Sequence, residues 1–148
     1  MIRPATASDL PEIARLGRAF FDQAGWSDVL EYDEGDCEAS LRAFMDTGLA
    51  IVLVADFGGI VGMCAGIVSP VYFKRDHLSG EELFWWVSDK APQSTGLKLL
   101  VGLENAARER GCTTWQMKSL ARLNGDRMGK LYERRGYRAS ENSFIKRL

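Results

Sequence analysis

The segment from Glu82 to Gly111 carries the residue pattern in this sequence that is best suited to binding chemistry. A hydrophobic run, Glu82–Val87, is followed by a polar loop and then by an amphipathic stretch near 94–110, which predicts a strand, a loop and a long helix. The first turn of a helix offers backbone N–H groups without partners and about half a positive charge. The pattern therefore predicts an anion site suited to a phosphate or pyrophosphate, although many junctions of this shape bind nothing.

Hydrophobic patterning predicts the elements that hold this segment in place. Apolar residues recur at helical spacing near 10–22, 36–47 and 124–135, and Gly136 follows the last of these as a helix-ending glycine. The strands expected are Ile2–Arg3, Leu49–Asp56 and Ile60–Ser69 as a hairpin, Glu82–Val87, Thr113–Leu120, and one or two in Tyr137–Leu148, with a mixed-charge loop at Val71–Gly80. This order predicts an α/β (α+β) fold with a mixed sheet covered by helices.

Length and composition set the broad class of the protein. The 148 residues fit a single domain over 1–148, and a net charge of −1 argues against nucleic-acid binding, which usually leaves a basic surface. The longest apolar run, Leu49–Ala55, is far shorter than the roughly 20 residues of a membrane span, and the N-terminus lacks a signal-peptide pattern. Cys37, Cys64 and Cys112 lie too far apart in sequence to suggest a disulfide framework or a zinc site. We therefore expect a cytoplasmic protein that binds neither nucleic acid nor membrane.

Two blocks of residues, in this order, have the form of known motifs. The first is Gln93-Ser94-Thr95-Gly96-Leu97-Lys98, and the second is Asn124 followed by Leu131-Tyr132-Glu133-Arg134-Arg135-Gly136-Tyr137. Together they resemble the phosphate loop (Gln/Arg-x-x-Gly-x-Gly/Ala) and the Leu-Tyr-x-x-x-Gly-Phe/Tyr block of the GNAT superfamily of N-acetyltransferases. The opening Ile-Arg-Pro-Ala-Thr is also similar to the family's start, so the resemblance covers nearly the whole chain. Lys98 departs from it, because the family has a small residue there; the lysine crowds the loop, turns outward or offers a charge to the phosphate.

The resemblance implies a fold, a co-substrate and a mechanism. The fold is a GNAT-like, mostly antiparallel sheet that is split between its fourth and fifth strands, has helices on both faces and binds acetyl-CoA in the split. The acceptor amine attacks the thioester directly, without an enzyme nucleophile or a metal, and Tyr132 is the family-matched general acid that protonates the departing CoA thiolate. The cofactor-binding positions carried over are Val87, Gln93, Ser94, Thr95, Gly96, Leu97, Lys98 and Asn124.

The general base has two candidates. Glu82 stands at the start of the fourth strand, where the family often places its glutamate, and strand alternation puts it on the face opposite to Glu81. His77 lies a few residues upstream, and its ordinary pKa suits a base. The same alternation makes Trp85 and Trp86 face opposite sides of the sheet.

The acceptor is expected to be a small-molecule or protein amine, taken by a monomer or a homodimer. The family builds its acceptor pocket from segments that correspond here to Phe20–Gly35 and Pro70–Gly80, and the first of these is rich in Asp and Glu. Two other functions stay open at this stage. One is a non-catalytic acyl-CoA-binding module for regulation or interaction, and the other is a small nucleotide-binding domain, although neither a P-loop nor a Gly-x-Gly-x-x-Gly motif occurs.

Overall fold

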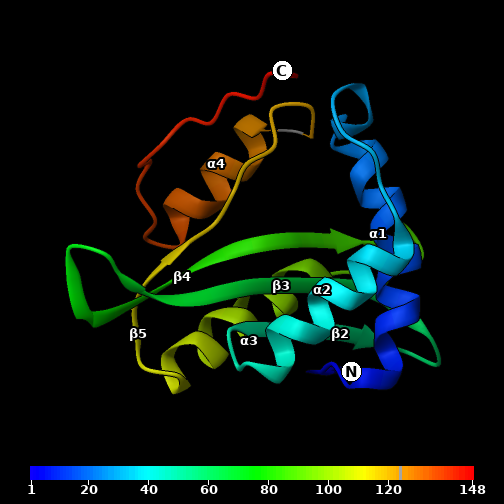
Figure 1. Cartoon of the computed structure of the whole chain (residues 1–148), viewed down its shortest axis with the longest axis horizontal. Helices are drawn as coiled ribbons and strands as arrows, with labels where there is room; N and C mark the ends of the chain where they lie inside the picture. The colour runs from blue at the N-terminus through cyan, green and yellow to red at the C-terminus, as the bar shows by residue number, and fades with distance from the viewer. Residues whose placement is uncertain (124) are drawn as a thin grey trace.

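A five-stranded sheet forms the centre of the computed structural model, which describes residues 1–123 and 125–148 (Figure 1). Its strands lie side by side in chain order, and neighbours pair antiparallel, except that β4 and β5 run parallel. The strands are β1 (Ile2–Pro4), β2 (Ala50–Asp56), β3 (Ile60–Val71), β4 (Lys74–Val87) and β5 (Cys112–Gln116).

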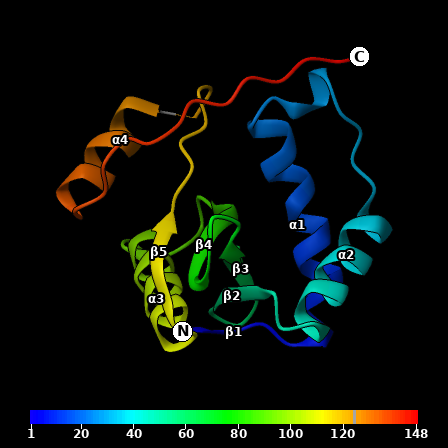
Figure 2. The same ribbon diagram turned by 60° about the vertical axis from the view of Figure 1, so that its left-hand side comes forward.

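Helices cover both faces of this sheet. They are α1 (Leu10–Gln23), α2 (Glu34–Asp46), α3 (Thr95–Glu109) and α4 (Gly125–Arg134), with the short 3-10 helices η1 (Ala7–Asp9) and η2 (Trp26–Asp28). One core, which includes Ile13 and Val54, lies under α1 and α2, and a second, which includes Cys64 and Leu99, lies under α3. In both views α4 and α1 lie on opposite sides of the end of β4 (Figure 2). The predicted mixed sheet with helices on both faces is confirmed.

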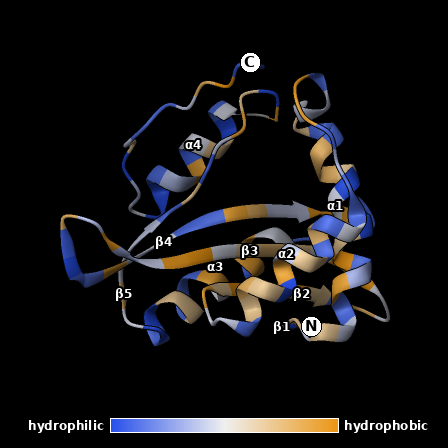
Figure 3. Cartoon of the chain, viewed as in Figure 1, coloured by the Kyte–Doolittle hydropathy of each residue, from blue (hydrophilic) through white to orange (hydrophobic). Residues whose placement is uncertain are grey.

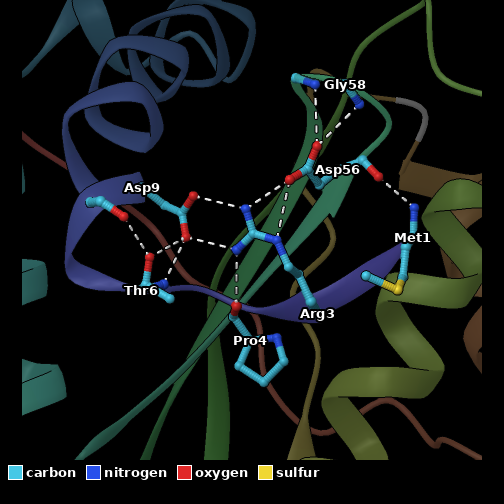
Figure 4. A network of polar contacts seen from close by, with 9 residues as sticks. Met1, Arg3, Pro4, Thr6, Asp9, Asp56 and Gly58 are labelled. Carbon is cyan, nitrogen blue, oxygen red and sulfur yellow. Dashed lines mark hydrogen bonds and ion pairs between the residues drawn. The ribbon is translucent and has the colours of Figure 1, made fainter.

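Arg3 joins the first strand to the start of α1 and to the end of β2 (Figure 4). Its guanidinium donates to the two carboxylate oxygens of Asp9 at 2.8 and 2.9 Å and to Asp56 Oδ2 at 2.8 Å. These hydrogen bonds hold the pKa of Asp9 well below its ordinary value. Asp9 also accepts the Thr6 N–H at 2.7 Å, so the network fixes the turn through which the chain enters α1.

Strand β4 contains a bulge at Leu83. Phe84 pairs with Ala65 and Glu82 pairs with Gly66, so Leu83 is the extra residue between them. As a result Leu83 and Phe84 both pack toward α1 and α2, whereas Trp85 packs toward α3 and Trp86 toward α1. The prediction that the two tryptophans face opposite sides is therefore confirmed.

The split between the fourth and fifth strands is also confirmed. Strand β4 pairs with β5 only from Leu78 to Glu81, whose partners are Cys112 and Gln116, and then continues to Val87 without a β5 neighbour. The edge of β4 that faces β5 is thus open for its last six residues within the described chain, from Glu82 to Val87.

Three predicted boundaries are wrong. The expected loop at Val71–Gly80 is the end of a long hairpin, because β3 reaches Val71 and β4 begins at Lys74 after a turn at Tyr72 and Phe73. This end of the hairpin projects beyond the helices, and residues 72–76 are exposed (Figure 1). A strand without a buried face has no alternating pattern, which is why its charged residues predict a loop.

The other two corrections concern the end of the chain. Strand β5 ends at Gln116 rather than at Leu120, because its partner strand diverges there. Residues 137–148 contain no strand in this structure, and Phe144 and Leu148 are fully exposed. The predicted C-terminal strands therefore have no neighbour here to pair with.

The hydropathy of the residues follows this architecture. Strand β2 and much of β3 are hydrophobic, whereas most of α4 is hydrophilic (Figure 3). None of the helices in the described part of the chain is both long enough and apolar enough to cross a bilayer.

Candidate functional site

The N-terminus of α3 lies beside the open end of β4. The Lys98 N–H donates to Ser94 O at 2.9 Å, whereas the N–H groups of Gly96 and Leu97 have no acceptor among the residues the structure describes. Two unused donors at the positive end of a fifteen-residue helix form an arrangement that suits an anion.

The remaining loop residues differ in exposure. Thr95 is buried and its hydroxyl donates to Pro92 O at 2.6 Å, which closes the turn before the helix. Ser94 has a φ of 67°, the left-handed conformation that L-residues rarely adopt. Gln93 and Lys98 are exposed, so Lys98 turns outward instead of crowding the loop.

Gly96 packs on the last side chains of β4. A Cβ at Gly96 would lie 3.4 Å from Trp85 Cζ2 and 3.6 Å from Val87 Cγ2, which is contact distance. The indole Nε1 of Trp85 is buried and lacks an acceptor within the described chain. An unpaired buried donor costs about 1–3 kcal/mol, so a ligand oxygen beside this indole would remove a penalty.

Glu82 and Tyr132 approach the split from its two sides. Glu82 is 5% exposed, and its Oε2 accepts the Lys118 N–H at 2.9 Å. The Tyr132 hydroxyl of α4 donates to the Lys118 carbonyl, also at 2.9 Å. Lys118 lies just beyond the end of β5, so its backbone holds both side chains where the strands part.

Burial shifts the pKa of both groups upward. Removal from water raises the pKa of Glu82 to about 7, although the Lys118 N–H opposes this rise by stabilising the carboxylate. Burial also raises the pKa of Tyr132, with the charge of Glu82 as a smaller contribution, so its phenol stays protonated through the neutral range. A carboxyl group that titrates near pH 7 is poised to accept a proton.

The structure does not bring His77 to this place. His77 lies in β4, and its ring bonds Thr113 Oγ1 at the beginning of β5, with Nε2 at 2.7 Å. It is five positions before Glu82, which is roughly 16 Å along an extended strand. Asn124, another predicted cofactor residue, lies outside the described residues.

A cavity of about 110 Å³ lies on the side of the sheet that α1 and α2 cover, opposite to the side toward which Glu82 points. We call it the aromatic cavity, because five of its ten lining residues are aromatic. Its walls come from α1, η2, the connection before α2, α2, β3 and β4: Ile13, Gly17, Phe20, Phe21, Trp26, Tyr32, Cys37, Met63, Leu83 and Phe84. The acidic side chains of Phe20–Gly35 are not among them.

Residues beside this cavity, at the end of α1 and in η2, contact the strand on one side of the split and the segment after the strand on the other. Trp86 Nε1 of β4 donates to Gln23 Oε1 at 3.2 Å, at the end of α1. Arg122, which follows β5, forms an ion pair with Asp28 at 2.6 Å and lies against Gly25, where a Cβ would meet the Arg122 guanidinium within 3 Å. The α1–η2 corner therefore reaches across the mouth of the split.

Lys118, Arg122 and the Trp85 indole are site residues that sequence reasoning missed. Lys118 acts through its backbone, which carries no residue-type signal, and Arg122 pairs with a residue 94 positions away. The position of Trp85 could have been found from the sequence, because strand alternation already placed its side chain on the face opposite to Trp86.

The sequence matches no protein-family model and no curated protein. The structure is similar to a ribosomal-protein-alanine N-acetyltransferase from Brucella melitensis, with a TM-score of 0.71 and 23% identity over 100% of this chain and 99% of the other. A GNAT family acetyltransferase from Staphylococcus aureus gives 0.70 and 17% over 100% and 98%. A predicted acetyltransferase from Clostridium acetobutylicum, solved with acetyl-CoA, gives 0.71 and 14% over 99% and 94%. These likenesses extend over the whole length of the fold.

Proposed function

We propose that this chain, which has the fold of the GNAT acetyltransferases, transfers an acetyl group from acetyl-CoA to an amine. The observation that carries the proposal is the pair of unused N–H donors on α3 beside an open strand edge, with Glu82 and Tyr132 on the two sides of the opening.

The co-substrate would bind along the split. Its pyrophosphate would accept the N–H groups of Gly96 and Leu97, and the exposed Lys98 would add a positive charge from outside the loop. The pantetheine arm would pair with the open edge of β4 near Val87, as an added strand does. The unpaired Trp85 indole supports this placement, because a ligand oxygen would supply its missing acceptor.

The chemistry needs one bond formed, one broken and two protons moved. The amine nitrogen attacks the thioester carbonyl, the C–N bond forms and the C–S bond breaks. Glu82, ionised above about pH 7, accepts the proton that the amine loses, directly or through a water. Tyr132 gives its proton to the departing thiolate, exchanging the Lys118 carbonyl for the sulfur as its hydrogen-bond partner.

Calorimetry with acetyl-CoA, ATP and NAD tests the binding half of this proposal. We expect acetyl-CoA to bind and the two nucleotides to bind at least about tenfold more weakly, because no nucleotide motif is present. An assay of CoA release with a panel of amines tests the transfer half. Binding without transfer to any amine would instead identify a non-catalytic acyl-CoA-binding module, and no binding would overturn both functions.

A further inference from the structure

We infer that the aromatic cavity holds an apolar side group of the acceptor, so that the substrate is an amine carrying a branched aliphatic or aromatic group. This inference rests on the proposed function, because it treats the cavity as the acceptor side of the same site.

The cavity has the lining that such a group requires. Phe20 and Phe21 are 6% exposed and Met63 is 1% exposed, so the inner walls are dry and apolar. The hydroxyl of Tyr32 is already used, because it donates to the Ala14 carbonyl at 2.6 Å. No charged side chain lies among the ten lining residues. A second cationic group seated among these inner walls would therefore be buried without a partner, because the nearby carboxylates of Glu31, Asp33 and Asp36 line an adjoining hollow outside Tyr32 and Cys37 instead.

The size of the cavity limits the group. An engineered cavity of roughly 150 Å³ lined by Leu, Ile and Phe stays dry and binds benzene. At about 110 Å³, this cavity fits a group between isobutyl and phenyl in size. Trp26, Tyr32 and Cys37 are only half-buried, so the cavity reaches the surface along them and a side group can enter there.

The position of the cavity relative to the split supports the assignment. The β4 bulge turns Leu83 and Phe84 into the cavity, while the adjacent Glu82 faces the split. The same α1–η2 corner that contributes Trp26 to the lining contacts Arg122 on the far side of the split through Asp28. Trp26 of this corner thus links the cavity lining to the contact with Arg122 beside the split, which is the side from which we infer the amine is presented.

Two amines of similar length separate the apolar from the charged group. Isoamylamine ends in an isopropyl group and 1,4-diaminobutane ends in a second ammonium. With CoA release as the readout, we expect kcat/KM to favour isoamylamine by at least about tenfold, and phenethylamine to be a substrate as well. Equal or better acetylation of 1,4-diaminobutane would overturn the inference and leave the proposed transfer intact.

Cavity variants connect this preference to the named residues. Cys37→Leu places extra carbons in the cavity, and we expect the KM for isoamylamine and phenethylamine to rise about tenfold while acetyl-CoA binding is unchanged. Ala39→Leu, which adds a leucine at an exposed position of α2 outside the cavity lining, is the matched control and keeps KM within about twofold. If Cys37→Leu folds poorly, Leu83→Ala tests the same wall, because a wider cavity shifts preference from isoamylamine toward phenethylamine.

The outcomes distinguish the two levels of the proposal. Unchanged amine preferences in the variants, with acetyl-CoA bound and transfer intact, would overturn only the cavity assignment. Absence of acetyl-CoA binding in the unmodified protein would overturn the proposed function and this inference with it.

Discussion

Glu82 and Tyr132 bond to the backbone of one residue, Lys118, the first through the N–H and the second through the carbonyl. The candidate base and the candidate acid are therefore positioned relative to each other by a single residue at the point where β4 and β5 part. Any movement of that residue changes the surroundings of both groups together. The catalytic role of each side chain can therefore be tested against a neighbouring residue of the same type that does not bond to the Lys118 backbone, Glu81 for Glu82 and Tyr137 for Tyr132.

Glu82→Gln is expected to lower kcat by about 10²- to 10⁴-fold, because the amide cannot accept the proton that the amine loses. In the unmodified protein, kcat/KM should rise with pH through about 7 as the carboxyl ionises, and this limb should vanish in the variant. Glu81→Gln is the control, since Glu81 is exposed and its carboxylate pairs with the exposed Lys118 ammonium, at 3.4 Å. A normal rate for Glu82→Gln would remove Glu82 as the base.

The same substitution is expected to change how stability depends on pH. Burial raises the pKa of Glu82 to about 7 from its ordinary value of 4.5, so the folded state holds a proton that the unfolded state has lost between these values. Stability is therefore fully present below about pH 4.5 and falls as pH rises through 7, by up to about 3 kcal/mol. Urea unfolding at pH 5 and pH 8 should show this loss, which Glu82→Gln lacks. An equal loss in the variant would contradict the shift.

Tyr132→Phe is expected to lower kcat by about tenfold or more, because the CoA thiolate then leaves without a proton donor. Affinity for acetyl-CoA should be unchanged. Tyr137→Phe is the matched control, since Tyr137 is a neighbouring tyrosine whose hydroxyl donates to Glu104 at 2.9 Å, away from the split. Both variants lose one hydrogen bond, worth about 1 kcal/mol of stability, so only a role in catalysis separates their rates.

Lys98→Ala is expected to weaken acetyl-CoA binding about threefold at low salt and less at high salt, because exposed charges are screened. Calorimetry at two salt concentrations measures both values. Lys74→Ala, at the hairpin end, is the control for an exposed lysine far along the chain from the α3 loop. Unchanged affinity at low salt would show that Lys98 does not reach the phosphates.

Much of the fold could be predicted because its signals are local. Period-two alternation placed Trp85 and Trp86 on opposite faces, and helical spacing located α1 and α3 to within a residue or two. Charged residues around His77 concealed the outer half of β4, because a strand solvated on both faces has no hydrophobic period.

The site was harder to predict because its contacts join distant segments. Glu82 could be preferred as a base from its strand position, but its contact with the Lys118 N–H depends on where β5 diverges. The aromatic cavity combines residues from five elements and the connection before α2, whereas the acidic composition of 22–36 predicted either a surface that attracts a cationic amine or a solvated loop. Composition counts side chains without showing which of them point inward.

The bulge at Leu83 shifts the alternation of β4 by one residue along the sequence. Glu82 and Phe84 are two positions apart and yet face opposite sides of the sheet, because they pair with the consecutive residues Gly66 and Ala65 of β3, and the pairing with β5 ends before the bulge. Loss of this one residue would therefore remove a wall of the aromatic cavity without turning any other side chain of β4 to the opposite face. A single-codon deletion at this point can therefore remodel the cavity while the strand pairing stays the same.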